Sequence, residues 1–167
     1  LDGPLRALAA LGARKPLNVS KTIGLTPSAL SGRASAQVDL NMVMRPGGKI
    51  EPGDWTADIR LRKASSTKPV AGRVFKDGDL TIRADRDVAR INGTAVVDGT
   101  KAEIAMVQPT DGSGGGSGSF RLTLSDKQRE QMGISTGGLL KGPITVEVDS
   151  AGNGNSKVVA NLKRAQL

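Results

Sequence analysis

The chain contains no cysteine and no histidine, and it is poor in aromatic residues. Its 167 residues include one Trp (Trp55), two Phe (Phe75 and Phe120) and no Tyr. The absence of Cys and His excludes disulfides, the commonest zinc ligands and most nucleophile–base pairs. Because aromatic side chains bury more area than any others, their scarcity makes a thick, self-contained core harder to build.

No stretch of the sequence is long and apolar enough to span a bilayer, and no signal peptide is visible. The first residue is Leu1 rather than Met. We therefore expect a single domain that is a fragment of a larger protein, with any anchor or targeting signal outside it. The lack of cysteine fits the periplasm as well as the cytosol.

The chain is basic, with 24 Lys and Arg against 16 Asp and Glu and a formal net charge of +8. Such a charge favours acidic partners, namely nucleic acid, anionic lipid headgroups or acidic polymers. The densest basic cluster is Arg83, Arg86 and Arg90, and it is interrupted by Asp85 and Asp87. A solvated basic face with no specific partner is an equally good interpretation.

Most of the sequence alternates apolar and polar residues with a period of two, which is typical of strands with one wetted face. The dipeptide Asp98-Gly99 is a strong signal for a two-residue hairpin, because both positions tolerate positive φ. The pattern predicts about eight antiparallel strands. They are expected near residues 34–40, 55–61, 80–82, 89–97, 102–106, 120–124, 144–148 and 158–162.

Two short helical segments are expected before the first of these strands. Asp2 is placed to cap a helix that ends at Gly12. Thr26 is placed to cap a second, shorter turn that ends at Gly32, with Leu30 facing inward.

A third helix and a flexible loop are expected in the second half. Ser125 and Gln128 form a capping box, and Gly133 closes the helix that it begins. The run of glycine and serine at residues 112–119 predicts a flexible connector. No Gly-Lys-Ser/Thr follows that run, so it is not a phosphate-binding loop.

The sequence also contains an internal similarity, which predicts one structural unit that begins twice, near residue 20 and near residue 129. Ile23–Gly32 and Met132–Gly142 each precede an alternating strand. A repeated unit that cannot bury its apolar face alone does so against its neighbours. Chance similarity of short Gly/Leu patterns is the alternative. The matched positions are Gly24 with Gly133, Leu30 with Leu140, and Gly32 with Gly142.

Four segments, in their order and spacing, resemble the AsmA-like superfamily in its YhdP/TamB-like branch. They are Gly24–Leu40, Lys76–Leu80, Ile91–Ala95 and Leu140–Val146. The resemblance covers most of the chain from Leu5 onward. It implies a strongly curved amphipathic antiparallel sheet, shaped as a groove or half-barrel, with two or three short helices.

The same resemblance implies a function and a location. Such proteins are anchored in the bacterial inner membrane, extend through the periplasm and are thought to carry phospholipid between the inner and outer membranes. We therefore expect a lipid-binding module whose partners are phospholipid acyl chains and neighbouring modules of the same chain, with self-association of the fragment also expected. The residues expected to line the groove are Val38, Leu40, Ile59, Leu61, Ile82, Ile91, Ile104, Met106, Leu122 and Val146.

Two other function classes stay open at this point. A plain β-sandwich would bury the same apolar faces against each other and serve as a structural or protein-interaction module. Nucleic-acid binding is permitted by the charge, but single-strand binders use exposed aromatics that this chain scarcely has. Nucleic acid is therefore not an expected partner.

An enzymatic role is not expected, nor is a cofactor or a metal ion. Three carboxylate pairs have the i,i+2 spacing that places both members on one side of a strand. None belongs to a calcium-loop ligand pattern, and acids beside glycine are favoured in turns for backbone reasons. The pairs are Asp77 with Asp79, Asp85 with Asp87, and Glu147 with Asp149.

Overall fold

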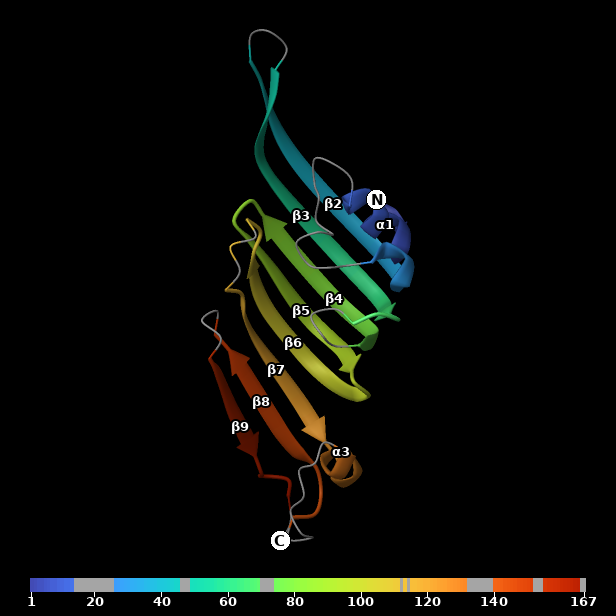
Figure 1. Ribbon diagram of the computed structural model, residues 1–167, viewed down its shortest axis with the longest axis vertical. Helices are drawn as coiled ribbons and strands as arrows, with labels where there is room; N and C mark the ends of the chain where they lie inside the picture. Colours follow the sequence, from blue (N-terminus) through green and yellow to red (C-terminus); the bar gives the residue numbers. More distant parts are fainter. Residues whose placement is uncertain are drawn as a thin grey trace.

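The computed structural model shows one open antiparallel sheet of nine strands (Figure 1), in which every strand pairs with its neighbours in sequence. The first and last strands are not paired with each other, so the sheet is not closed into a barrel. This confirms that the protein is mainly β and antiparallel. The residues that the structure describes are 1–13, 26–45, 49–69, 74–111, 113, 115–131, 140–151 and 155–165.

The elements follow one another along the chain as a meander with short helices at one end. The helical elements are α1 (Leu5–Gly12), the 3-10 turn η1 (Pro27–Ala29) and α3 (Asp126–Gln131). The strands are β1 (Asp2–Pro4), β2 (Leu30–Arg45), β3 (Lys49–Ser66), β4 (Phe75–Asp85), β5 (Val88–Val97), β6 (Thr100–Pro109), β7 (Ser117–Leu124), β8 (Ile144–Ser150) and β9 (Ser156–Asn161).

The period of two separates an apolar face from a charged face across the whole sheet. Directly paired residues point to the same side, and Ile91 pairs with Ile82 on one neighbour and Met106 on the other. On the opposite face Glu103 pairs with Arg121. The described residues form no second sheet to pack against the apolar face, so the sandwich alternative has no partner layer within them.

A row of irregularities crosses four neighbouring strands, β2 to β5, near the end of the sheet that carries the helices. The register shifts at Gly32 on β2, beside Lys63 on β3 and beside Asp77 on β4. All three have positive φ, and so does Gly93 on β5. Bulges locally disrupt the pairing of strands, so this bulge row interrupts the regular ladder at the end of the sheet that carries the helices.

The first helix lies on the apolar face at the corner of the sheet formed by β2 and β3. Leu5 is buried against Leu30, Ala34 and Ala64, and Leu8 packs beside them. The prediction that Asp2 caps this helix is wrong. Asp2 belongs to β1 and its carboxylate pairs instead with Arg33 at 3.0 Å, because the chain is already paired to β2 before the helix begins.

The second predicted turn exists but is shorter than expected. Thr26 precedes η1 without a side-chain cap, and Leu30 is buried as predicted. Gly32 does not end this turn, because the chain has already entered β2 at Leu30. Its φ of +108° instead allows the first bulge of the row.

Two local signals in the second half are confirmed. Asp98 and Gly99 both have positive φ and join β5 to β6 as a tight hairpin. Ser125 and Gln128 form the expected capping box, with the Ser125 amide donating to Gln128 Oε1 at 3.0 Å. Gly133, the predicted end of this helix, lies outside the described residues.

Asp126 ties α3 to the segment that leads into β8. Its carboxylate accepts hydrogen bonds from the Gly142 amide and from the buried guanidinium of Arg129. The Gly142 amide, followed by Arg129, lowers the pKa of Asp126 below its ordinary value. Arg129 is 2% exposed and also donates to the Leu140 carbonyl, so this corner depends on a charged carboxylate.

This geometry predicts an acid-sensitive corner. Because the folded pKa of Asp126 is lowered, its contribution to stability is complete above the unfolded pKa and is lost as pH falls through the folded pKa. Wild type should therefore lose more stability between pH 7 and pH 3 than Asp126→Asn, measured as the shift in the urea midpoint. Equal shifts in the two proteins would contradict this account.

Candidate functional site

The ten residues expected to line a groove all lie on the apolar face of the sheet. Ile59, Ile82, Ile91 and Met106 form one continuous cross-strand row. Ile104 pairs with Phe120, and Leu122 with Val146, closer to the helical end. The remaining members follow the same alternation on β2 and β3: they are Val38, Leu40 and Leu61.

Several further residues extend this face beyond the ten. Leu80 pairs with Leu61, Phe120 with Val148, and Trp55 with Leu40. The same two-residue alternation in the sequence predicts that all of these residues lie on the apolar face. The small residues Ala36, Ala57, Gly93 and Ala95 also belong to this face, where they leave room between the larger side chains.

Burial on the apolar face falls from the helical end toward the other end. Near the bulge row, Ala64, Ala95 and Ala102 are almost completely buried. Farther along the strands, Val38 is 37% exposed and Leu40 is 54% exposed. Among the described residues, Leu124 is the one large side chain that is less than 2% exposed, so most of the larger apolar side chains still meet solvent.

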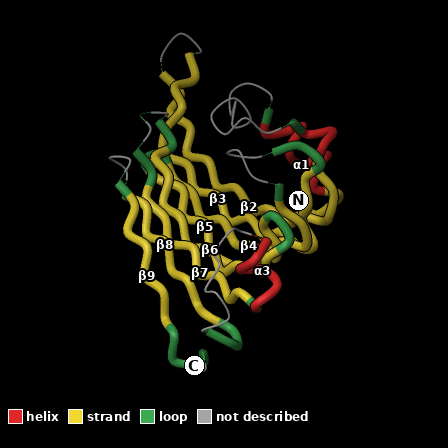
Figure 2. Tube along the Cα trace, turned by 60° about the horizontal axis from the view of Figure 1, so that its bottom comes forward, coloured by secondary structure: helices red, strands yellow, loops and turns green. Residues whose placement is uncertain are grey.

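The described helices cover only the corners of this face. Figure 2 shows α1 and α3 on the same side of the sheet, near the ends of the strands. α1 covers β2 and β3 through Leu5 and Leu8. α3 reaches the sheet through Gln128, whose side chain approaches Thr100 Oγ1 at 3.5 Å. The central Ile and Met row between them keeps an intermediate exposure.

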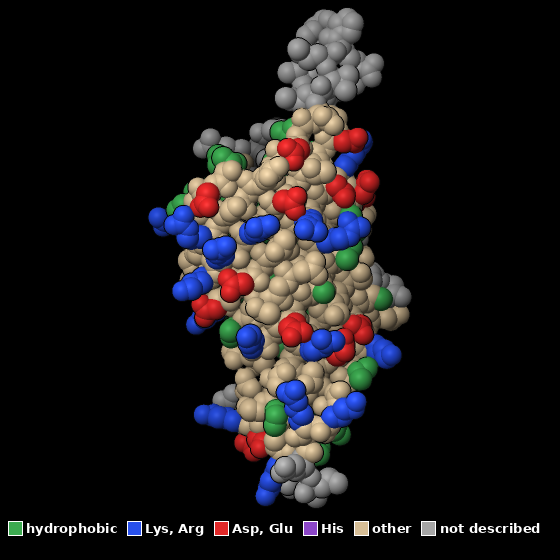
Figure 3. All heavy atoms as spheres, turned by 180° about the vertical axis from the view of Figure 1, so that it is seen from behind, with side chains coloured by type: hydrophobic (Ala, Val, Ile, Leu, Met, Phe, Trp, Pro, Cys, Tyr) green, Lys and Arg blue, Asp and Glu red, His purple; other side chains and the backbone are tan. Residues whose placement is uncertain are grey.

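The reverse face is polar and carries charges of both signs (Figure 3), and several of them form cross-strand ion pairs. Arg121 bridges Glu103 on β6 and Glu147 on β8, each at 3.2 Å. Arg83 meets Asp58 at the same distance. All these side chains are well exposed, and such pairs contribute little stability. The reverse face is therefore a solvated surface. The apolar face is the side whose apolar side chains the described residues do not fully bury.

The three carboxylate pairs have backbone roles at turns and bulges or cross-strand ion pairs. Asp79 accepts the Lys63 amide at the bulge row. Asp85 accepts the Val88 and Asp87 amides, which lower its pKa. Glu147 pairs with Arg121. Within the described ranges no three carboxylates gather as a metal-binding group.

Two matched glycines of the predicted internal repeat both have positive φ. Gly32 has a φ of +108° and Gly142 a φ of +90°, and Leu30 and Leu140 precede them. Gly24 and Gly133, the other matched pair, lie outside the described residues.

No protein-family model, curated protein or solved structure is significantly similar to the chain. The described helices include none that is long and apolar enough to cross a bilayer. The apolar face is therefore interpreted from its own geometry.

Proposed function

We propose that the apolar face binds lipid acyl chains. The observation that carries this proposal is a continuous apolar surface, spread over an open sheet, that the described part of the chain leaves half-exposed. Exposed apolar patches larger than a few hundred Å² are rare on monomers and mark sites of interaction. The alternation places the charged side chains on the reverse face. The apolar face is therefore the side that we propose to contact the acyl chains.

The dimensions of the face suit an extended hydrocarbon chain. From Ala34 to Leu40, β2 rises about 20 Å at roughly 3.4 Å per residue. One leaflet of a bilayer contributes about half of its ~30 Å hydrocarbon core. An acyl chain of about 15 Å laid along β2 therefore covers roughly four residues, which is the distance from Ala34 to the exposed Val38.

The energetics favour such a ligand. Each buried CH₂ contributes about 0.8 kcal/mol, so partial burial of roughly sixteen methylenes supplies several kcal/mol. Association costs ~4–15 kcal/mol before any affinity appears. We propose that the sheet curls into a groove, because contact on several sides is needed to exceed that cost.

We extend the proposal to the parent protein on the strength of the AsmA-like resemblance alone. The chain would be one module of an inner-membrane-anchored protein that spans the periplasm and moves phospholipid between the two membranes. Neighbouring modules of the same chain would continue the apolar face.

Trp55 offers a direct test, because it is the only Trp in the chain and lies on the apolar face beside Leu40. Phospholipid brominated in its acyl chains should quench Trp55 fluorescence, whereas the same lipid without bromine should not. Added monomeric brominated lysophospholipid avoids a requirement for vesicles. Undiminished fluorescence at saturating ligand would contradict lipid binding at this face.

A second candidate is a docking module that pairs through its sheet edge. All six residues of β9 are exposed, and Val158 is 64% exposed. Unpaired edge strands are templates for an added strand. If this function holds, Val158→Pro, which cannot continue the pairing, should abolish a concentration-dependent dimer in native mass spectrometry. It should leave Trp55 quenching unchanged.

A further inference from the structure

The two rims of the sheet, where the strands end, differ in charge, and the rim beside the helices is strongly basic. The helix-side rim is defined as the outermost two residues of each strand at that end, together with the segments that connect these ends and the segment that follows β9. It carries nine Lys and Arg against three acidic residues among the described side chains. The cations are Arg6, Lys68, Lys76, Lys101, Lys127, Arg129, Lys141, Lys163 and Arg164, and the acids are Asp98, Asp126 and Glu130.

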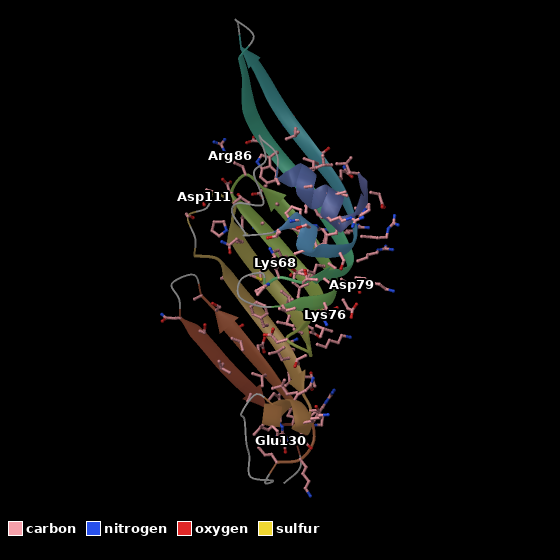
Figure 4. The ribbon with its side chains drawn as sticks, turned by 45° about the vertical axis from the view of Figure 1, so that its right-hand side comes forward. Lys68, Lys76, Asp79, Arg86, Asp111 and Glu130 are labelled. Carbon is pink, nitrogen blue, oxygen red and sulfur yellow. The ribbon has the colours of Figure 1, made fainter. Side chains whose placement is uncertain are left out.

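The opposite rim carries a balanced charge. Its strand ends and turns from β2 to β9 hold four acids and four cations, since β2 ends at Arg45 and β3 begins at Lys49. Figure 4 shows Arg86 and Asp111 of this rim at the opposite end of the strands from Lys76. The charged members of the opposite rim are Asp85, Asp87, Asp111, Asp149, Arg45, Lys49, Arg86 and Lys157.

The positive charge of the helix-side rim does not depend on where that rim is drawn. Including the neighbouring bulge residues Lys63, Asp77 and Asp79 adds one cation and two acids to the helix-side rim, which stays strongly positive. Arg129 and Asp126 neutralise each other. The other helix-side cations form no ion pair among the described residues, so their charge is available to a partner.

The arrangement of these cations suits a flat anionic surface. They are distributed over the strand ends from β3 to β9, a line of roughly 30 Å at about 4.8 Å per strand. Leu162, next to Lys163 and Arg164, is 46% exposed. Exposed apolar side chains among cations are typical of segments that lie in a lipid headgroup layer. The aromatic platforms that single-stranded nucleic acid uses are missing here, because Phe75 packs against the α1 core.

We propose that the helix-side rim docks on the surface of a bilayer that contains anionic phospholipid. The opposite rim, which has no excess of cations, then faces away from the membrane, so the difference in charge between the rims sets the orientation of the sheet. Docking in this way brings one edge of the apolar face to the headgroup layer. The proposal does not depend on acyl-chain binding, since a sheet could dock by this rim without extracting lipid.

The test is cosedimentation of the full chain with phosphatidylcholine vesicles, with and without phosphatidylglycerol. The rim variant is Lys76→Glu/Lys101→Glu/Lys141→Glu. The control is Arg60→Glu/Arg86→Glu/Lys157→Glu, which makes the same change in net charge on the reverse face and the opposite rim. Circular dichroism and urea midpoints establish that both variants fold. If the Glu variants do not fold, the same two sets with Gln replace them.

Wild type should bind only the anionic vesicles, and added salt should weaken the binding. Each cation near an anionic membrane is worth about fivefold in affinity. The rim variant should therefore bind about 100-fold more weakly, while the control stays within severalfold of wild type. Equal losses in both variants, equal binding to both kinds of vesicle, or binding to RNA without binding to vesicles would each overturn the proposal. Trp55 quenching by monomeric lipid should survive in the rim variant, which separates this result from failure of the acyl-chain site.

Discussion

Gly93→Ala is expected to lower the free energy of unfolding by about 3 kcal/mol. Gly93 has a φ of +148°, and a Cβ at this position would lie 2.1 Å from the Asp79 carbonyl oxygen and 2.9 Å from Leu80 Cα. Both contacts are with the backbone of the paired strand β4, which cannot move without breaking the ladder. The substitution therefore combines a strained backbone with a steric clash at the bulge row.

Gly99→Ala is the matched control for this prediction. Gly99 also has positive φ, +82°, but a Cβ there would meet no atom within 4 Å. Only the backbone strain remains, which costs about 1 kcal/mol. Urea unfolding with unchanged m-values compares the two variants. Similar losses for both would mean that the close approach of β4 and β5 at Gly93 is not a constraint on the fold.

Ile91→Asp is expected to reduce acyl-chain affinity by about 100-fold while the protein still folds. Ile91 occupies the middle of the apolar row, between Ile82 and Met106, and is only partly buried. A carboxylate there stays hydrated in the free protein, so its effect on stability is modest. A bound hydrocarbon chain would remove that water, and an unpaired charge in an apolar contact is costly.

Asn92→Asp adds the same charge one residue away, and it should leave lipid affinity unchanged. Asn92 pairs with Thr81 and Ala105 on the reverse face and is exposed. Because successive strand residues point to opposite sides, the two variants differ in which face carries the new carboxylate. An equal loss in both would mean that net charge, and not the apolar face, controls binding.

The sequence predicted the faces of the sheet well because a period of two is a local signal. Ile59, Ile82, Ile91 and Met106 could be assigned to one side from their own strands alone. Pairing each strand with the next then brought them into one row. Local turn chemistry was equally readable at Asp98-Gly99 and at the Ser125–Gln128 capping box, where the deciding contacts lie within four residues.

The bulge row could not be predicted in the same way. Lys63 and Asp77 adopt positive φ although neither residue type demands it, so their conformation follows from the strands that they pair with. The sequence predicts Gly32 as the end of a turn, since glycine is typical of the residue just after a helix. β1 was missed because three residues are too short for any period to show.

What covers the apolar face is a question that alternation cannot answer. The pattern on β2 is the same whether Val38 and Leu40 meet a second sheet, a lipid or water. In the described residues α1 covers the β2–β3 corner and α3 reaches Thr100, while Leu40 stays more than half exposed. A bound ligand on the apolar face is therefore the observation that would establish this face as a binding surface.

The most direct test of that interpretation is native mass spectrometry of the protein purified gently from bacteria, followed by solvent extraction and lipid analysis. The proposal predicts that phospholipid copurifies with wild type and with Asn92→Asp and is lost from a folded Ile91→Asp. A lipid-free, monodisperse wild-type protein, or lipid retained at the wild-type level by Ile91→Asp, would contradict it.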